Sequence, residues 1–392
     1  MDELISRRLR HRVRVLGDIL GETMIDQHGP EFVEKIEEIR VLAKQRRQGN
    51  DTPDRALHTV LKNLEGDTLV SVARAFNQFL NLANIAEQAE ADDLRHGDFP
   101  QASNLNTLFN HLEATGISQA DMIATINNIS CELVLTAHPT EITRRTLIQK
   151  YNRIASQLEK VTEDQPLTSN NRLELERLIA EVWYTDEIRT EPPTPQDEAK
   201  WGYAVIEHSF WNAIPKLWKG LDQLLFEHTG THLSITSTPV KIASWMGGDR
   251  DGNPNVTARV TDEVVRLARW MAADLYLRDV EELLSQLSMS QCSDEIRQLS
   301  NGEAHEPYRV VLRNLREQLT ATRQWSSSDE PPQEGLILQP HQLFDPLFAC
   351  YESLHSCGMG IIANGLLKDT LVRVTTFGVT LVDLDIRQNA DK

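Results

Sequence analysis

The chain has 392 residues, of which 40% are hydrophobic and 25% are charged, as expected for a globular protein with room for two domains or one large α/β unit. A formal net charge of -18 argues against nucleic acid and against anionic membrane surfaces as partners, because both favour positive protein surfaces. No run of apolar residues approaches the length that crosses a bilayer. An anionic ligand would therefore have to be held by local arginines against the overall field.

The first third of the chain, residues 1–130, shows helical periodicity and no group of residues typical of catalysis, so we expect a helical scaffold. Its start is rich in arginine but also carries acidic residues and lacks a continuous apolar region. These features predict a docked amphipathic helix and not a targeting peptide. Four cysteines lack any metal-binding spacing and are expected to be reduced, buried thiols of a cytoplasmic protein: Cys131, Cys292, Cys350 and Cys357.

The first informative motif follows a short apolar run, Leu133 to Ala137, which predicts a buried strand. The strand should stop at His138, since Pro139 has no N–H for a ladder, and a helix is predicted to follow. Catalytic groups of α/β proteins gather at such strand ends. A core histidine beside the surface residues Arg144 and Arg145 is the alternative, but the proline break and the arginine pair favour a site.

The second motif begins with a predicted strand, Val240 to Trp245, which leads into Gly247, Gly248 and a charged loop containing Arg250. Adjacent glycines let the backbone approach a ligand and present N–H groups to an anion. A plain turn and a calcium loop are the alternatives, and the EF-hand pattern is incomplete. Asn253 or Asn255 is expected to cap the long helix that follows, with Asp262 and Glu263 in its first turn.

The third motif lies near residue 387 and alternates as a strand should. Val382, Leu384 and Ile386 occupy one predicted face, and Asp383, Asp385 and Arg387 occupy the other. The charged face could meet solvent, or it could line a closed barrel whose outer side is covered by helices. Charges inside a barrel are costly unless they are paired or bound to a ligand, so the second interpretation implies a site. The spacing leaves both interpretations open.

Taken together, the motifs resemble the phosphoenolpyruvate carboxylase family over essentially the whole chain. The resemblance rests on VLTAHPTEITRRT around His138, SWMGGDRDGNPN from Ser244, GMGIIANG, and LVDLDIRQ around Arg387, together with TDEIR. It implies a mainly α-helical chain with a few parallel strands, belonging to an eight-stranded α/β (TIM-like) barrel embedded in helices. Residues 131–392 would form the first part of that barrel, with about three strands, after the helical region 1–130. A homotetramer is usual in the family.

The resemblance also implies a reaction: bicarbonate carboxylates phosphoenolpyruvate to oxaloacetate and phosphate, with Mg²⁺ or Mn²⁺, through carboxyphosphate and an enolate. The product feeds the tricarboxylic acid cycle. By motif position, His138 corresponds to the base that helps carboxyphosphate collapse, and Arg387 to the phosphate-binding arginine. Trp245, Arg250, Gly247 and Gly248 are candidates for lining the bicarbonate or enolate pocket. Arg144 and Arg145 match a basic pair linked to sugar-phosphate activation in plant relatives.

Family chains are more than twice as long as this one, which stops five residues after Arg387. The resemblance places the metal ligands, a second essential histidine and a glycine- and arginine-rich loop in the part beyond it. We therefore expect an N-terminal portion that is inactive and aggregation-prone alone. A non-catalytic helical module that binds an anion or a partner is the alternative, as is a purely structural helical protein. Intact His138 and Arg387 favour the enzyme.

Overall fold

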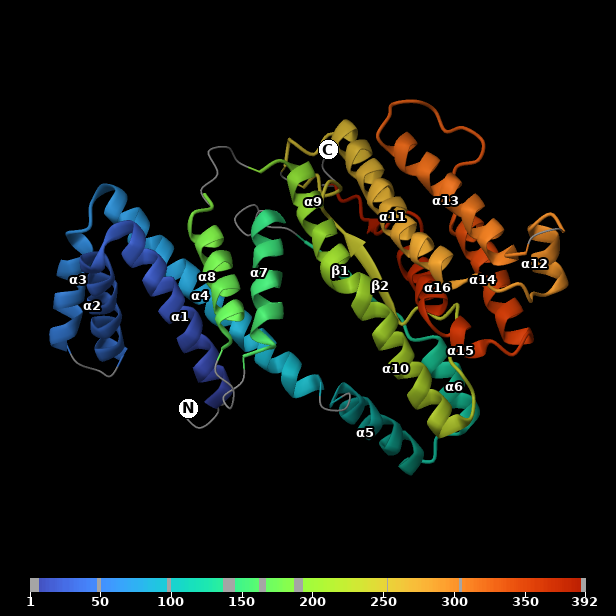
Figure 1. Cartoon of the computed structure of the whole chain (residues 1–392), viewed down its shortest axis with the longest axis horizontal. Helices are drawn as coiled ribbons and strands as arrows, with labels where there is room; N and C mark the ends of the chain where they lie inside the picture. The colour runs from blue at the N-terminus through green and yellow to red at the C-terminus, as the bar shows by residue number, and fades with distance from the viewer. Residues whose placement is uncertain are drawn as a thin grey trace. The chain divides into compact units, whose positions relative to one another are not determined.

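The computed structural model describes residues 7–47, 51–96, 100–136, 145–161, 167–186, 193–251, 253–302 and 305–388. In these ranges the protein is mainly helical with one three-stranded parallel sheet, which confirms the predicted helical chain with a few parallel strands (Figure 1). Its contacts divide the chain into two units: unit 1 is Met1–Gln101 with Thr143–Arg189, and unit 2 is Ala102–Ile142 with Thr190–Lys392. Residues 143–189 therefore group with the N-terminal helices, although they follow the expected boundary at residue 130 in the chain.

Unit 1 is a helical assembly built around the first helix. Its helices are α1 (Arg7–His28), α2 (Pro30–Arg47), α3 (Asp51–Lys62), α4 (Gly66–His96), α7 (Arg145–Leu158) and α8 (Ser169–Trp183). α1 packs against α2, α4 and α8, and its residues Leu16 and Ile19 are fully buried. Arg12 is also fully buried, and its Nε donates to the carbonyl of Val161 at 3.3 Å while its Nη1 lies 3.4 Å from Glu90. A charge on the apolar side of α1 is thus compensated by a carboxylate of α4.

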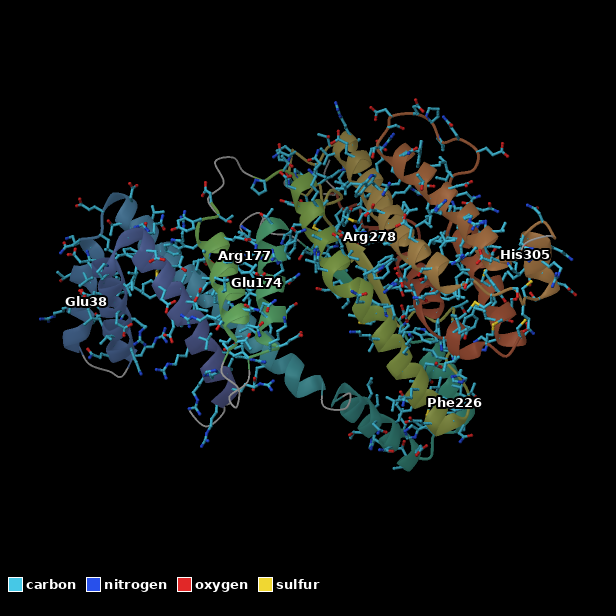
Figure 2. The ribbon with its side chains drawn as sticks, in the orientation of Figure 1. Glu38, Glu174, Arg177, Phe226, Arg278 and His305 are labelled. Carbon is cyan, nitrogen blue, oxygen red and sulfur yellow. The ribbon has the colours of Figure 1, made fainter. Side chains whose placement is uncertain are left out.

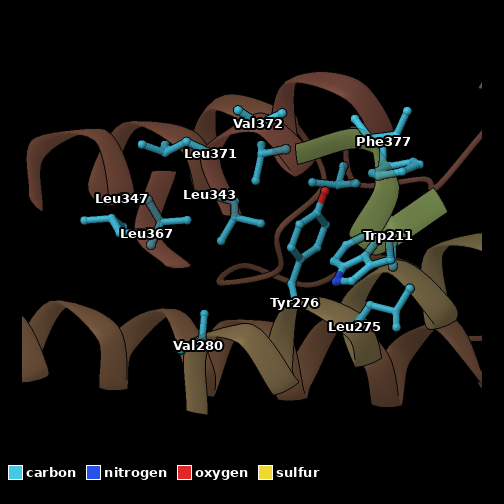
Figure 3. Close-up of a cluster of buried hydrophobic side chains, with 14 of the residues drawn as sticks. Trp211, Leu275, Tyr276, Val280, Leu343, Leu347, Leu367, Leu371, Val372 and Phe377 are labelled. Carbon is cyan, nitrogen blue, oxygen red and sulfur yellow. The ribbon is translucent and has the colours of Figure 1, made fainter. Parts of the chain in front are cut away.

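Unit 2 holds the sheet and most of the long helices. The helices are α5 (Pro100–Ala114), which begins at the unit boundary, α6 (Gln119–Asn127), α9 (Pro195–Val205), α10 (Trp211–Thr229), α11 (Ala258–Gln286), α12 (Asp294–Leu299), α13 (Pro307–Ser326), α14 (Pro340–Ser356), α15 (Gly360–Ala363) and α16 (Leu366–Phe377). A π-helical segment, Ile206–Phe210, joins α9 to α10. In the core shown in Figure 3, Trp211 stacks on Phe377 at 5.1 Å and meets Tyr276 edge-on at 5.0 Å.

The sheet has the order β1-β2-β3, with β1 (Cys131–Leu135), β2 (Val240–Ser244) and β3 (Asp383–Leu384) all parallel. β2 lies in the middle and is buried at its carboxyl end, whereas β1 is exposed along most of its length. The prediction of a buried strand at residues 133–137 is therefore wrong in both its bounds and its burial. β1 pairs with β2 alone among the described strands, so its other edge lacks a neighbour there.

Two other local expectations are also corrected by the structure. α11 is capped by Thr257, whose side chain accepts the N–H of Val260, and no acidic residue lies in its first turn. Asn253 instead accepts the N–H of Asn255 at 3.0 Å, a local turn that keeps this segment out of the helix.

Charged side chains form ion pairs, and the cysteines differ in burial. On the surface, Arg177 pairs with Glu174 one helical turn away at 2.7 Å (Figure 2). Arg278 of α11, also labelled there, pairs at 2.9 Å with Glu207, whose side chain is nearly buried. All four cysteines are free, and burial raises the pKa of Cys350 to about 12. Cys292 and Cys357 are half-buried and Cys131 is exposed, so the prediction of buried thiols holds for Cys350 alone. Among the described residues, no helix is long and apolar enough to cross a membrane.

Candidate functional site

The candidate site lies at the carboxyl ends of the three strands. Because the strands are parallel, their carboxyl ends meet at one edge of the sheet. Directly beyond β2, the N–H of Trp245 donates to the carbonyl of Leu135, the last residue of β1, at 3.0 Å. On the other side, the N–H of Asp385, just after β3, donates to the carbonyl of Ser244 at 3.0 Å. Trp245 therefore lies between the ends of the two neighbouring strands.

The side chain of Trp245 joins two residues that follow β3. Its indole Nε1 donates to Oδ2 of Asp385 at 3.1 Å. The guanidinium of Arg387 lies over the same ring, with its central carbon 4.0 Å from the ring centroid. A cation over an indole face is attracted by the ring quadrupole, and a planar guanidinium stacks well there. Asp385 thus orients the surface on which Arg387 rests.

Arg387 is also tied to the loop after β2. Its N–H donates to the carbonyl of Gly248 at 3.0 Å, and its carbonyl accepts the N–H of Arg250 at 2.9 Å. Its Nη1 lies 3.6 Å from Oδ2 of Asp249, and 45% of its side chain is exposed. The arginine is therefore fixed at its backbone, supported on one face and open to solvent, which suits a guanidinium that binds an anion.

The paired glycines of this loop are explained first by packing. Gly247 has φ +80°, and a Cβ there would lie 2.7 Å from Cγ2 of Val264 in α11. A Cβ on Gly248 would lie 2.1 Å from the carbonyl oxygen of Asp385. The N–H groups of Gly248 and Asp249 both donate to the carbonyl of Trp245, at 2.9 and 3.0 Å. Part of the expected anion cradle is thus already occupied by backbone acceptors, and ligand binding by the glycines stays a prediction.

Arg250 lies half-buried on the α11 side of the loop. Its Nη2 donates to the hydroxyl of Thr261 at 3.3 Å, and that hydroxyl donates to the carbonyl of Gly247 at 2.8 Å. Its Nε is buried without an acceptor among the described residues. Buried donors usually have a hydrogen-bond acceptor, so Nε of Arg250 is an unusual polar atom of this site.

The structure brings together Trp245, Gly247, Gly248, Arg250 and Arg387 from the predicted set. His138 and Arg144 lie outside the described residues, and Arg145 is the first residue of α7, in unit 1. Two contributors were not predicted as site residues: Asp249 and Asp385. Alternation already placed Asp385 on the same strand face as Arg387, but only the structure shows its bond to an indole from another strand.

Among the described residues, no group of three or more histidine, cysteine, aspartate or glutamate side chains is arranged to hold a metal ion. The two carboxylates of the site already have partners: Asp385 accepts from the Trp245 indole, and Asp249 lies 3.6 Å from the guanidinium of Arg387. These carboxylates therefore do not fit a divalent metal centre by themselves. The chemistry open to the described site is anion binding by a supported arginine.

Comparison with known proteins agrees with the motifs that form this site. The family model described as phosphoenolpyruvate carboxylase matches residues 9–392. Curated phosphoenolpyruvate carboxylases from Pseudomonas syringae pv. tomato and Pseudomonas fluorescens are each 51% identical over 399 aligned residues, and the one from Pseudomonas aeruginosa is 49% identical over 396. The alignments cover 98–99% of this chain but 45% of each relative. The chain belongs to the phosphoenolpyruvate carboxylase family and spans a little under half the length of these relatives.

Proposed function

We propose that this chain supplies the phosphate-binding arginine and the base of a phosphoenolpyruvate carboxylase. The reaction is the carboxylation of phosphoenolpyruvate by bicarbonate to oxaloacetate and phosphate, which makes the protein a carboxy-lyase that replenishes the tricarboxylic acid cycle. The observation that carries the proposal is the guanidinium of Arg387, held over Trp245 where the three parallel strands end. The family membership of the chain supports it.

Arg387 binds the phosphate of phosphoenolpyruvate in this proposal. A guanidinium presents paired donors that match phosphate oxygens, and phosphoryl transfer is catalysed mainly by positioning and charge stabilisation. Trp245 and Asp249 hold the guanidinium of Arg387 in place. Asp385 acts indirectly, because it accepts a hydrogen bond from the Trp245 indole and so orients the ring. Arg250, Gly247 and Gly248 line the neighbouring pocket for bicarbonate or the enolate.

His138 is the proposed base. It follows Leu135 by three residues, a stretch that spans at most about 10 Å, so the chain keeps it within reach of the β1 end beside Trp245. The phosphoryl group passes from phosphoenolpyruvate to a bicarbonate oxygen, leaving the enolate of pyruvate and carboxyphosphate. His138 accepts the carboxyl proton of carboxyphosphate as its C–O bond to phosphate breaks. The CO₂ released is attacked by the enolate carbon, which forms the new C–C bond of oxaloacetate.

The divalent metal of the family, Mg²⁺ or Mn²⁺, has no matching ligand set among the described residues. We propose that its ligands come from the part of the family polypeptide that this chain does not span. The same part would supply the remaining strands of an eight-stranded barrel, to which residues 131–392 contribute the first strands. Parallel sheets are normally covered on both faces, and the exposure of β1 supports this proposal.

Three further features of the family are proposed for this protein. The assembled enzyme is a homotetramer, and its location is cytoplasmic, in keeping with four free cysteines. Arg144 and Arg145 form an anion or activator site, and Arg145 is the first residue of α7.

The test is oxaloacetate formation from phosphoenolpyruvate, measured with bicarbonate and Mg²⁺. The chain is assayed alone and after mixing with the separately expressed remainder of the Pseudomonas syringae pv. tomato relative, the part this chain does not match. We expect no activity from the chain alone and activity from the mixture. Arg387→Lys keeps the charge but loses the planar fork, and should lower activity about 10- to 100-fold.

A matched control is Arg259→Lys, because this arginine of α11 is 89% exposed and, among the described residues, pairs with its helical neighbour Glu263 alone. It should leave activity unchanged. Full activity with Arg387→Lys would contradict the proposed phosphate site. Activity from the chain alone would show that a metal centre forms within these 392 residues.

A further inference from the structure

Unit 1 carries a large open groove that the proposed reaction does not use. The groove has a volume of ≈ 1070 Å³, and its described lining residues come from α1, α2 and α4. Because α1 packs against both α2 and α4, it forms the floor, and the other two helices form the walls. Phe79 and Leu80 on the α4 wall are 37% and 59% exposed. An apolar surface of this kind marks an interaction site more often than a plain exterior.

The floor of the groove contains two glycines one helical turn apart, Gly17 and Gly21. Glycine inside a helix destabilises it relative to alanine, so such positions call for a packing reason. A Cβ on Gly17 would lie 3.4 Å from the ring of Phe79, which is an ordinary van der Waals contact. A Cβ on Gly21 would meet nothing within 4 Å, so packing within the described residues explains neither glycine. The space above Gly21 is suited to the close approach of another backbone.

The size of the groove favours a helix over a small ligand. The floor runs from Leu9 to Met24, about 22 Å at the helical rise of 1.5 Å per residue, which matches a helix of about four turns. Small-molecule pockets are typically about 300–1,000 Å³ and enclose most of their ligand, whereas this groove is at least as large and open. Amphipathic helices commonly bind grooves of this form through an apolar stripe.

The charge at the rim selects the kind of helix. The lining includes five basic residues, Arg10, Arg14, Arg40, Lys44 and Arg47, against three acidic ones, Asp18, Glu37 and Glu87, although the whole chain has a net charge of -18. Arg40 is paired with Glu37 of its own helix. A complementary occupant would carry acidic residues beside its apolar stripe, because opposite charges across an interface fix partner and orientation.

We propose that this groove receives an acidic amphipathic α-helix from the part of the family polypeptide that this chain does not span. The curated relatives extend far beyond the matched stretch, since the alignment covers 45% of their length. The helix lays its apolar stripe across Gly21 and Leu80, and its acidic flanks meet Arg14 and Lys44. The groove is thus an assembly surface between the two parts of the enzyme, separate from the strand-end site.

The test measures binding of the separately expressed remainder of the Pseudomonas syringae pv. tomato relative to the full 392-residue chain by titration calorimetry. Gly21→Leu fills the floor while favouring the helix, so it should raise the melting temperature of the chain and weaken binding at least tenfold. Leu80→Glu should weaken binding to a similar extent. Leu173→Glu is the matched control, because this leucine of α8 is 65% exposed and lies outside the groove.

The double variant Arg14→Glu with Lys44→Glu tests the charge and should weaken binding more at low salt than at high salt. Unchanged affinity in Gly21→Leu and Leu80→Glu would overturn the proposal, as would the absence of binding by the wild-type chain. Dimerisation of the chain that these two variants abolish would assign the groove to a second copy instead. Binding by the groove variants is measured without turnover, so its outcome is independent of the Arg387 experiment.

Discussion

The strands β1 and β2 are neighbours of similar apolar character, yet they lie in opposite environments. Leu133 of β1 and Ile242 of β2 are register partners and therefore point to the same face of the sheet. Leu133 is 39% exposed and Ile242 is 2% exposed. The central strand has a neighbour on each side, contacts α16 and is buried at its carboxyl end, whereas the described residues give β1 one neighbour only.

This difference shows that an apolar run predicts a strand better than it predicts burial. Hydrophobic periodicity indicates that a segment can form a strand, but the elements packed against that strand determine which of its residues are buried. An exposed apolar edge is also a liability, because unpaired N–H and C=O groups can recruit another chain. The contrast can be tested by matched substitutions in buried and exposed settings.

The largest loss of unfolding free energy is expected on breaking a buried ion pair. Lys368 of α16 donates to Asp222 of α10 at 2.8 Å, and both residues are buried. Lys368→Met should cost about 3–5 kcal/mol of unfolding free energy near pH 7, because Asp222 keeps its charge without a cation. The exposed counterpart Arg259→Met should cost at most about 1 kcal/mol. Urea denaturation of the three proteins measures both values.

The same pair makes a pH prediction. Burial by itself would raise the pKa of Asp222, but hydrogen bonds from Lys368 and from the N–H of Leu233 outweigh it and leave this pKa below its ordinary value. A lowered folded-state pKa contributes stability above the unfolded pKa near 3.9, and this contribution is lost as pH falls through the folded value. The stability difference between wild type and Lys368→Met should therefore shrink below about pH 4. A constant difference down to pH 2 would contradict this assignment.

Matched substitutions in β2 and β1 should also differ in the unfolding free energy that they cost, by nearly as much as the substitutions of the buried and exposed charges. Ile242→Ala removes a fully packed side chain and should cost about 2–5 kcal/mol. Leu133→Ala removes a side chain already partly in water and should cost about 1 kcal/mol or less. Thermal and urea unfolding of both variants measures these losses of unfolding free energy. Equal losses would mean that β1 is covered in solution.

A smaller effect is expected at the junction of β2 and β3. Trp245→Phe keeps a ring for Arg387 but deletes the hydrogen bond to Asp385, so it should cost about 0.5–1.5 kcal/mol. Trp201→Phe in α9 is a control that leaves the strand ends untouched. In the reconstituted enzyme, Trp245→Phe should raise the KM for phosphoenolpyruvate more than it lowers kcat. A change in kcat alone would argue against a positioning role for the indole.

The smallest change in stability is expected on the exposed strand. Val134→Lys adds a charge to β1, where the valine is 37% exposed, and should alter the unfolding free energy by about 0.5 kcal/mol or less. It should nevertheless reduce aggregation measured by light scattering, because charged edges resist pairing with other chains. Ala243→Lys on the neighbouring buried strand should instead unfold the protein.

Much of the candidate site could be predicted from the sequence because its signals are local. The glycine pair after β2 and the alternation around Arg387 depend on residues close in the chain, and both lie where a parallel strand ends. The partners of these residues are not local. Asp385 meets Trp245 across 140 residues of sequence, and Thr261 meets the carbonyl of Gly247 only because α11 returns beneath the loop.

The sequence by itself determined the mainly helical class, the three regions of the chain that hold the strands, though not all of their bounds, and the family of the chain, since periodicity, turn residues and motifs are properties of the sequence. Only the tertiary structure decided that β2 is buried while β1 is exposed, that Gly248 is glycine because a backbone carbonyl lies against it, and that Arg387 rests on an indole. The physical reason is that burial and side-chain pairing are properties of neighbours in space. Those neighbours come from distant parts of the chain.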